Sequence, residues 1–137
     1  WIEIYNGTGT SVDLTNWNIS DAFSTDFFPE SIVLEHESYA LITNSASTVD
    51  FWSLPETQII SIGSVLGNGL SNTGDALYLK NEIGEIVDSL NWGSNTDIFD
   101  PSALDVAEGH SLARESLAED TDTADDWIEL ESPNPGT

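Results

Sequence analysis

Carboxylates are the most numerous side chains with chemical potential in this sequence. The 137 residues include 25 Asp and Glu, but only 2 Lys and Arg, 2 His and no Cys. The stretch "EDTDTADDW" places Asp120, Asp122, Asp125 and Asp126 in close succession. Carboxylate oxygens are preferred ligands of calcium. Two interpretations follow: a calcium site formed by some of these four aspartates, or a solvated acidic loop, which is the usual fate of clustered acids.

The EF-hand is the most specific calcium motif to test against this stretch. Asp120, Asp122 and Glu131 occupy the first, third and twelfth positions of such a loop. The fifth position is Ala124, which has no ligand atom, and the sixth is Asp125, where the loop needs glycine. The sequence therefore argues against an EF-hand. A looser set of oxygen ligands remains as the calcium hypothesis, and no other cofactor is predicted.

The sequence offers little for catalysis. A serine hydrolase needs a base beside its nucleophile, and His36 and His110 are the only histidines. Zinc sites need cysteines or closely spaced histidines. Pairs of carboxylates suit a glycosidase, but with so many acids such pairs arise by chance. We therefore predict no catalytic residues and no enzyme activity.

Aromatic residues in two acidic segments suggest contacts with a partner. Phe23 and Phe27 lie in "DAFSTDFFPE", and Trp52 lies in "DFWSLPE". Exposed aromatic side chains are frequent anchors of interfaces. Packing in the core is the alternative for most aromatic residues. Phe23, Phe27 and Trp52 are the predicted partner-binding residues.

The net charge of -23 restricts the partners. Nucleic acids and anionic lipids bind through Lys and Arg, and here Lys80 and Arg114 are the only ones. We therefore expect no nucleic acid partner, and attraction to cations or a basic protein. Solubility in a salty medium explains the same charge. No apolar run approaches the roughly 20 residues that cross a membrane, so no membrane insertion is expected. A start at Trp1 suggests a fragment or a processed product.

Short alternating runs predict an all-β fold of one domain, residues 1–137. Turn residues recur roughly every 8–12 positions, which is typical of a sandwich or barrel. In the hairpin "LSNTGDALYLKNEIGEIVDSLNW", Gly84 provides the turn, and Ile86, Leu90 and Trp92 share one face. A short helical turn is the best interpretation of Ser102–Ala107, inside a surface loop spanning Gly93–Gly109. The expected strands lie around Ile2–Tyr5, at Ile32–Leu34, at Tyr39–Thr43, within residues 57–64, at Ala76–Lys80 and at Ile86–Trp92.

The apolar positions of these runs predict the core. Its expected members are Ile2, Ile4, Leu14, Trp17, Ile19, Leu41, Leu77, Leu79, Leu90, Leu112 and Ile128.

Five motifs in order resemble the lamin tail domain family, in its prokaryotic branch. They are "WIEIYNGTGTSVDLTNWNISD", "YALIT", the hairpin quoted above, "EGHSLARE" and "DDWIELESPNPGT". The resemblance spans the whole chain. It implies an immunoglobulin-like β-sandwich without a shared catalytic set, in which Gly74 and Asp75 form a tight turn before a strand. Prokaryotic relatives are accessory modules of larger, often exported proteins.

These observations predict a non-catalytic module that tethers, spaces or binds a protein partner within a larger, exported protein, extracellular or at the cell surface. The first alternative is a cation-dependent adhesion or glycan-binding module. The second is an accessory domain that positions substrate for a fused hydrolase. The oligomeric state is left open.

Overall fold

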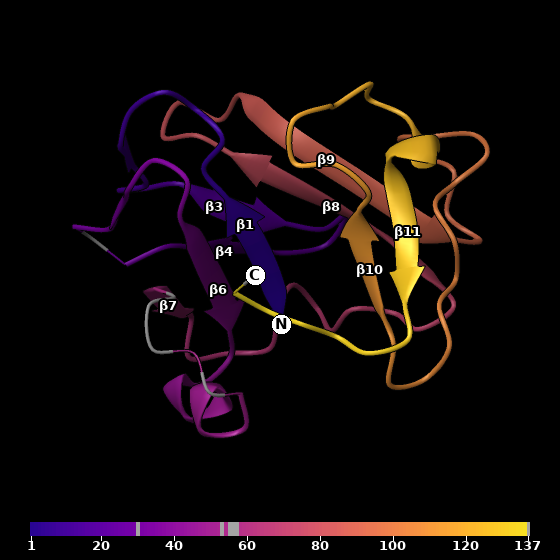
Figure 1. Cartoon of the computed structure of the whole chain (residues 1–137), viewed down its shortest axis with the longest axis horizontal. Coiled ribbons are helices and arrows are strands. Elements are labelled where there is room, and N and C mark those ends of the chain that lie inside the picture. The colour runs from indigo at the N-terminus through magenta and orange to yellow at the C-terminus, as the bar shows by residue number, and fades with distance from the viewer. Residues whose placement is uncertain (30, 53, 55–57, 137) are drawn as a thin grey trace.

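The computed structural model describes residues 1–29, 31–52, 54 and 58–136. Its regular structure consists almost entirely of short strands (Figure 1). Two short 3-10 helices accompany them, η1 (Ala46–Asp50) and η2 (Ala124–Asp126). The predicted all-β class is confirmed. The strands are β1 (Ile2–Tyr5), β2 (Val12–Asp13), β3 (Asn18–Ser20), β4 (Thr25–Phe27), β5 (Val33–Leu34), β6 (Tyr39–Thr43), β7 (Gln58–Ser61), β8 (Gly74–Lys80), β9 (Ile86–Gly93), β10 (Ser111–Arg114) and β11 (Trp127–Leu130).

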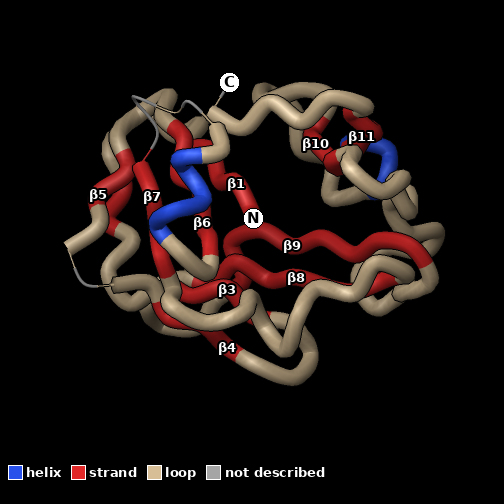
Figure 2. The backbone as a smooth tube through the Cα atoms, turned by 90° about the horizontal axis from the view of Figure 1, so that it is seen from below, coloured by secondary structure: helices blue, strands red, loops and turns tan. Residues whose placement is uncertain are grey.

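The strands form a sandwich of two layers (Figure 2). One layer is a four-stranded sheet with the order β4-β3-β8-β9. The other layer holds the three-stranded sheet β1-β6-β7 and, apart from it, the hairpin β10-β11. The two-stranded ribbon β2-β5 lies at the β7 end of the molecule (Figure 2).

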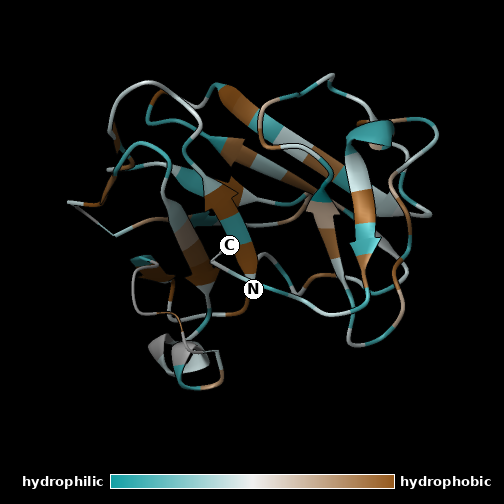
Figure 3. Cartoon of the chain, viewed as in Figure 1, coloured by the Kyte–Doolittle hydropathy of each residue, from teal (hydrophilic) through white to brown (hydrophobic). Residues whose placement is uncertain are grey.

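Alternation of side chains along the strands builds the core between the layers. In the pair β1-β6, Ile2 lies opposite Ile42 and Ile4 opposite Ala40, and all four pack in the core. Ile19 enters the same cluster from the other layer. Figure 3 shows the alternation along β1, where two apolar residues flank the polar Glu3. Period-two burial of this kind is what fixes strand register.

The opposite face of β6 is also covered. Leu41 points away from the core cluster but is fully buried. The end of the chain runs over β1 and β6 (Figure 1). There Pro135 is buried, and the backbone N–H of Gly136 donates to the Glu3 carboxylate on the same face as Leu41. The C-terminal segment therefore seals the outer side of the three-stranded sheet.

Most of the predicted core is confirmed. Leu14, Ile19, Leu41 and Leu77 are buried. Ile2, Ile4, Trp17 and Leu79 are partly buried and pack against the main cluster. Leu90, Leu112 and Ile128 are only half-buried and lie outside that cluster. For Leu112 and Ile128 the reason is that they belong to the separate β10-β11 hairpin.

The predicted strands agree with the structure to within one or two residues, except that the run within residues 57–64 forms a strand only as far as Ser61. Thr57 lies outside the described residues. The helical turn predicted for Ser102–Ala107 is wrong. Ala103 instead forms a parallel bridge with Trp92, donates to the carbonyl of Asn91 at 3.1 Å and accepts from the N–H of Gly93 at 3.0 Å. These bonds to the edge of β9 hold Ala103 extended within the predicted loop.

The expected turn at Gly74 and Asp75 is displaced. The turn lies at residues 72–73, and Gly74 already pairs with Gly93 across β8 and β9. Asp75 follows the turn and stabilises it, because its carboxylate accepts the N–H of Ser71 at 3.0 Å. Gly84 adopts a φ of 83° in the β8-β9 turn, as predicted.

The predicted shared face of Ile86, Leu90 and Trp92 is wrong for Ile86. Between β8 and β9 the register slips, so that Leu79 opposes Asp88 but Lys80 opposes Ile86. Val87 is the extra residue of this bulge. The bulge turns Ile86 to the side opposite that of Leu90 and Trp92.

Candidate functional site

The outward face of the four-stranded sheet differs from the rest of this acidic chain. Directly paired residues point to the same side of a sheet. Ile19, Leu77 and Leu79 point to the core, so their neighbours along each strand point outward. In the described strands, none of these outward residues is acidic, although the chain has 25 acids. We call this side of the sheet the outer face; it consists of Asn18, Ser20, Thr25, Phe27, Ala76, Tyr78, Lys80, Ile86, Ser89 and Asn91. Asn18, Ser20, Ala76 and Asn91 are buried, and the other six side chains are partly or largely exposed.

Apolar side chains project from the outer face. Phe27 is 65% exposed and Ile86 is 57% exposed. Lys80, the only lysine, lies with its Nζ 5.3 Å from the centroid of the Tyr78 ring, within the range of a cation–π contact. The oxygens Asn18 Oδ1 and Ser20 Oγ are buried and have no hydrogen-bond partner among the described residues.

Phe23 lies at the turn between β3 and β4 and is 79% exposed. The Asp21 carboxylate holds this turn, accepting the N–H groups of Phe23 at 2.7 Å, Ser24 at 2.6 Å and Asn68 at 2.8 Å. Burial raises the pKa of Asp21, but these backbone donors outweigh it and leave the pKa below its ordinary value. Of the predicted partner-binding residues, Phe27 is therefore on the outer face and Phe23 is at the end of the adjoining hairpin.

Trp52, the third predicted residue, belongs to a different aromatic cluster. Its ring centroid lies 6.2 Å from that of Trp1 and 5.6 Å from that of Phe51, both edge to face. Trp1 precedes β1 and Trp52 follows η1, so the cluster sits on the layer opposite the outer face.

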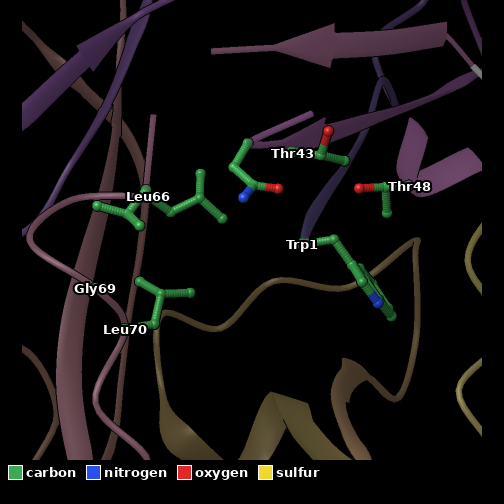
Figure 4. Close-up of a pocket in the computed structure, with 8 residues that line it drawn as sticks. Trp1, Thr43, Thr48, Leu66, Gly69 and Leu70 are labelled. Carbon is green, nitrogen blue, oxygen red and sulfur yellow. The ribbon is translucent and has the colours of Figure 1, made fainter. Parts of the chain in front are cut away.

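A hollow of about 220 Å³ opens beside Trp1 (Figure 4). The Trp1 ring forms one wall, and Leu66 and Leu70 lie across from it. The hydroxyl-bearing Thr43 and Thr48 lie next to Trp1, on the same side of the hollow. The remaining lining residues are Asn44, Val65 and Gly69.

Two of the four predicted calcium ligands, Asp120 and Asp126, form ion pairs with Arg114 instead. Its Nη1 lies 2.9 Å from Asp120 Oδ1 and 3.7 Å from Asp126 Oδ2, and its Nη2 lies 2.9 Å from Asp88 Oδ1 on β9. The guanidinium also lies 4.7 Å from the centroid of the Trp127 ring. Burial lowers the pKa of Arg114, but Asp88 and Asp120 raise it above its usual value. Arg114 is therefore the cation that these carboxylates share.

The other contacts of the predicted ligands are local. Asp126 accepts the N–H of Thr121 at 2.8 Å and its hydroxyl at 2.7 Å, which lowers the pKa of Asp126. Asp120 accepts the N–H of Asp122 at 3.1 Å. Asp125 and Asp126 line a hollow of about 460 Å³. In the described part of the chain, no group of three or more His, Cys, Asp or Glu residues has a geometry that could hold a metal ion.

Each histidine lies beside a glutamate. His110 Nδ1 lies 2.6 Å from Glu129 Oε1, and His36 Nε2 lies 3.7 Å from Glu37 Oε1. The pKa of Glu129 is lowered by the N–H of Ala107 and by His110. These pairs are surface contacts rather than a nucleophile with its base.

The comparison with protein families agrees with this architecture. A model described as Lamin Tail Domain matches residues 1–94 of the 137-residue chain. The chain belongs to the lamin tail domain family. The β-sandwich of this lamin tail domain is therefore immunoglobulin-like, as predicted, and its family is one of non-catalytic, protein-interaction or structural domains. No curated protein and no solved structure matches the chain.

The surfaces of this lamin tail domain differ in whether they lie within the residues that match the family model. The outer face and the hollow beside Trp1 lie within residues 1–94, and Arg114 with its carboxylates lies mainly beyond them. Among the described residues, no helix is both long and apolar enough to span a membrane.

We expect monovalent salt to raise the melting temperature of this lamin tail domain, and calcium at equal ionic strength to add little. Screening, with a Debye length of about 8 Å at physiological ionic strength, relieves repulsion within a chain of net charge -23. Calcium would have to displace Arg114 from Asp120 and Asp126. Thermal denaturation in NaCl and in CaCl₂ measures both effects. A strong gain with calcium that is lost in the variant carrying Asp120→Asn, Asp122→Asn and Asp126→Asn would instead establish a metal site.

Sequence reasoning missed several residues of these surfaces. Lys80 and Tyr78 carried a signal, because they alternate with core leucines on β8 and so had to point outward together. Trp1 was not predicted to meet Trp52, since the two are far apart in sequence and only the β1-β6-β7 layer brings them together.

Proposed function

We propose that this lamin tail domain is a non-catalytic interaction module that binds a protein partner on its outer face, within a larger, exported protein. The observation that carries the proposal is the composition of that face. It is acid-free among the described strands and bears the exposed Phe27 and Ile86. Interfaces are depleted of acids and enriched in aromatic side chains at their centres.

Electrostatics restricts the partner further. The overall charge of -23 attracts a basic protein over long range. We place the contact itself on the outer face, which has no acidic residues among its described strand positions. Nucleic acid is not among the proposed partners, because Arg114 is occupied by carboxylates and Lys80 is the only other strong base. The high acid content suits an extracellular, salty medium.

We also take residues 1–137 as one domain. Contacts of Arg114 with Asp88, and of Ala103 with β9, tie the segment beyond residue 94 to the sandwich. The C-terminal segment returns to Glu3 on β1.

The test compares proteins retained from an extract of the source cells. We expect one or more proteins to bind the native domain and to be lost with the Phe27→Ser, Ile86→Ser variant, because truncating interface anchors weakens binding about 10-fold or more. The matched control is Phe51→Ser, since Phe51 is 84% exposed but lies away from the outer face. An identical set of bound proteins for all three forms would contradict the proposal.

A further inference from the structure

The hollow beside Trp1 is a second surface whose chemistry differs from that of the outer face. The side chains of all eight lining residues are uncharged, in a chain of net charge -23. A charged ligand group would find no charged side chain in this lining, and an anion would be repelled by the net charge of the whole molecule. The ligand that fits this electrostatic setting is neutral.

The walls of the hollow are divided into an apolar and a polar part. The Trp1 ring, 39% exposed, faces Leu66 and Leu70 (Figure 4). The edge-to-face contact with Trp52 supports the Trp1 ring from outside the hollow. A supported aromatic wall offers a ligand an apolar surface at low entropic cost.

The polar part carries hydrogen-bonding groups that are not used within the protein. The Asn44 amide and the Thr48 hydroxyl have no hydrogen-bond partner among the described residues. Thr43 differs, because its hydroxyl donates to the carbonyl of Ser45 at 2.7 Å. An amide and a hydroxyl together supply both donors and acceptors, which matches a ligand with several hydroxyl groups.

The volume of the hollow limits the size of the ligand. The volume of about 220 Å³ is below the roughly 300–1,000 Å³ of sites for drug-sized molecules. A single ring fits better than a peptide segment. A ring with one apolar face and hydroxyl groups at its edge is a sugar.

We propose that the hollow beside Trp1 binds one ring of a neutral sugar, with the apolar face of the ring on Trp1 and its hydroxyl groups on Asn44 and Thr48. This site is independent of the proposed protein partner, because it lies on the other layer of the sandwich. It gives the domain a saccharide-binding surface in addition to a protein-binding one.

The test follows the indole N–H resonances in NMR spectra while a panel of neutral mono- and oligosaccharides is added. We expect at least one neutral sugar to shift the Trp1 resonance with a dissociation constant of about 1 mM, which corresponds to about -4 kcal/mol. Trp1→Ala should abolish binding, judged by the backbone amide of Asn44, and Asn44→Ala should weaken it about 10-fold. The matched aromatic control is Phe51→Ala, which should bind normally because Phe51 does not line the hollow.

Two results would overturn the proposal. One is the absence of any shift with neutral sugars at concentrations roughly ten times that constant. The other is a shift with N-acetylprolinamide alone, which would assign the hollow to an apolar side chain of a protein. The Phe27→Ser, Ile86→Ser variant should keep sugar binding, so failure of the outer-face proposal is distinguishable from failure of this one.

Discussion

Gly93→Ala is expected to lower the free energy of unfolding by about 3 kcal/mol or more, a large effect for the addition of a single methyl group. Gly93 has a φ of 62°, and a Cβ added to it would collide with the backbone carbonyl of Thr73. Neither backbone can move freely. Gly93 donates to Ala103 at 3.0 Å, and Ser94 donates to the same Thr73 carbonyl at 3.0 Å.

Gly63→Ala separates the collision from the backbone strain. Gly63 has a similar φ of 70°, but a Cβ there would have open space around it. Left-handed strain alone should cost about 1 kcal/mol. Urea denaturation of both variants measures the difference. Equal losses would show that the approach of the Thr73 carbonyl to Gly93 is not a constraint on the fold.

Arg114→Gln is expected to cost about 2 kcal/mol, less than the 3–5 kcal/mol of a fully buried pair, because Asp88 and Asp120 are 40% and 50% exposed. The change removes the shared cation of Asp88, Asp120 and Asp126 and leaves three carboxylates facing one another. It also removes a contact between β10 and β9. We expect faster hydrogen exchange in β10 and β11, and partial recovery of stability in molar NaCl.

Lys80→Gln is the matched control for this loss. It makes the same change in net charge, but the Lys80 ammonium lies over the Tyr78 ring and forms none of the ion pairs found among the described residues. Denaturation and hydrogen exchange of the Lys80 variant should stay close to those of the native protein. Equal losses in the two variants would attribute the effect to net charge rather than to the carboxylates around Arg114.

Local patterns in the sequence were sufficient for the strands and much of the core. Ile2 and Ile4, or Leu77 and Leu79, alternate with polar residues, and a period of two leaves one choice of buried face. The family motifs then supplied the sandwich. The outer face was predicted only in part. Phe27 was identified from the sequence, but the absence of acidic residues around it depends on which strands are neighbours in the sheet.

The features that could not be predicted depend on contacts between distant segments. Ile86 follows the expected alternation until the bulge at Val87 reverses its direction. Ala103 is extended because β9 binds its backbone, whatever its helical preference. From their spacing in the sequence, Asp120 and Asp126 were predicted as calcium ligands. The fold instead places Arg114, at the end of β10, beside them.

The bulge at Val87 has a further consequence, for association between copies of the molecule. β9 is the longest strand and lies at the edge of its sheet, and a straight, unpaired edge invites another chain to add a strand and begin an aggregate. Here the edge is blunted along its length. Val87 distorts its beginning, the Asp88 carboxylate accepts the N–H of Ser89 at 2.7 Å, and Ala103 covers its end. This edge of the four-stranded sheet therefore offers little free backbone with which a second copy of the chain could pair.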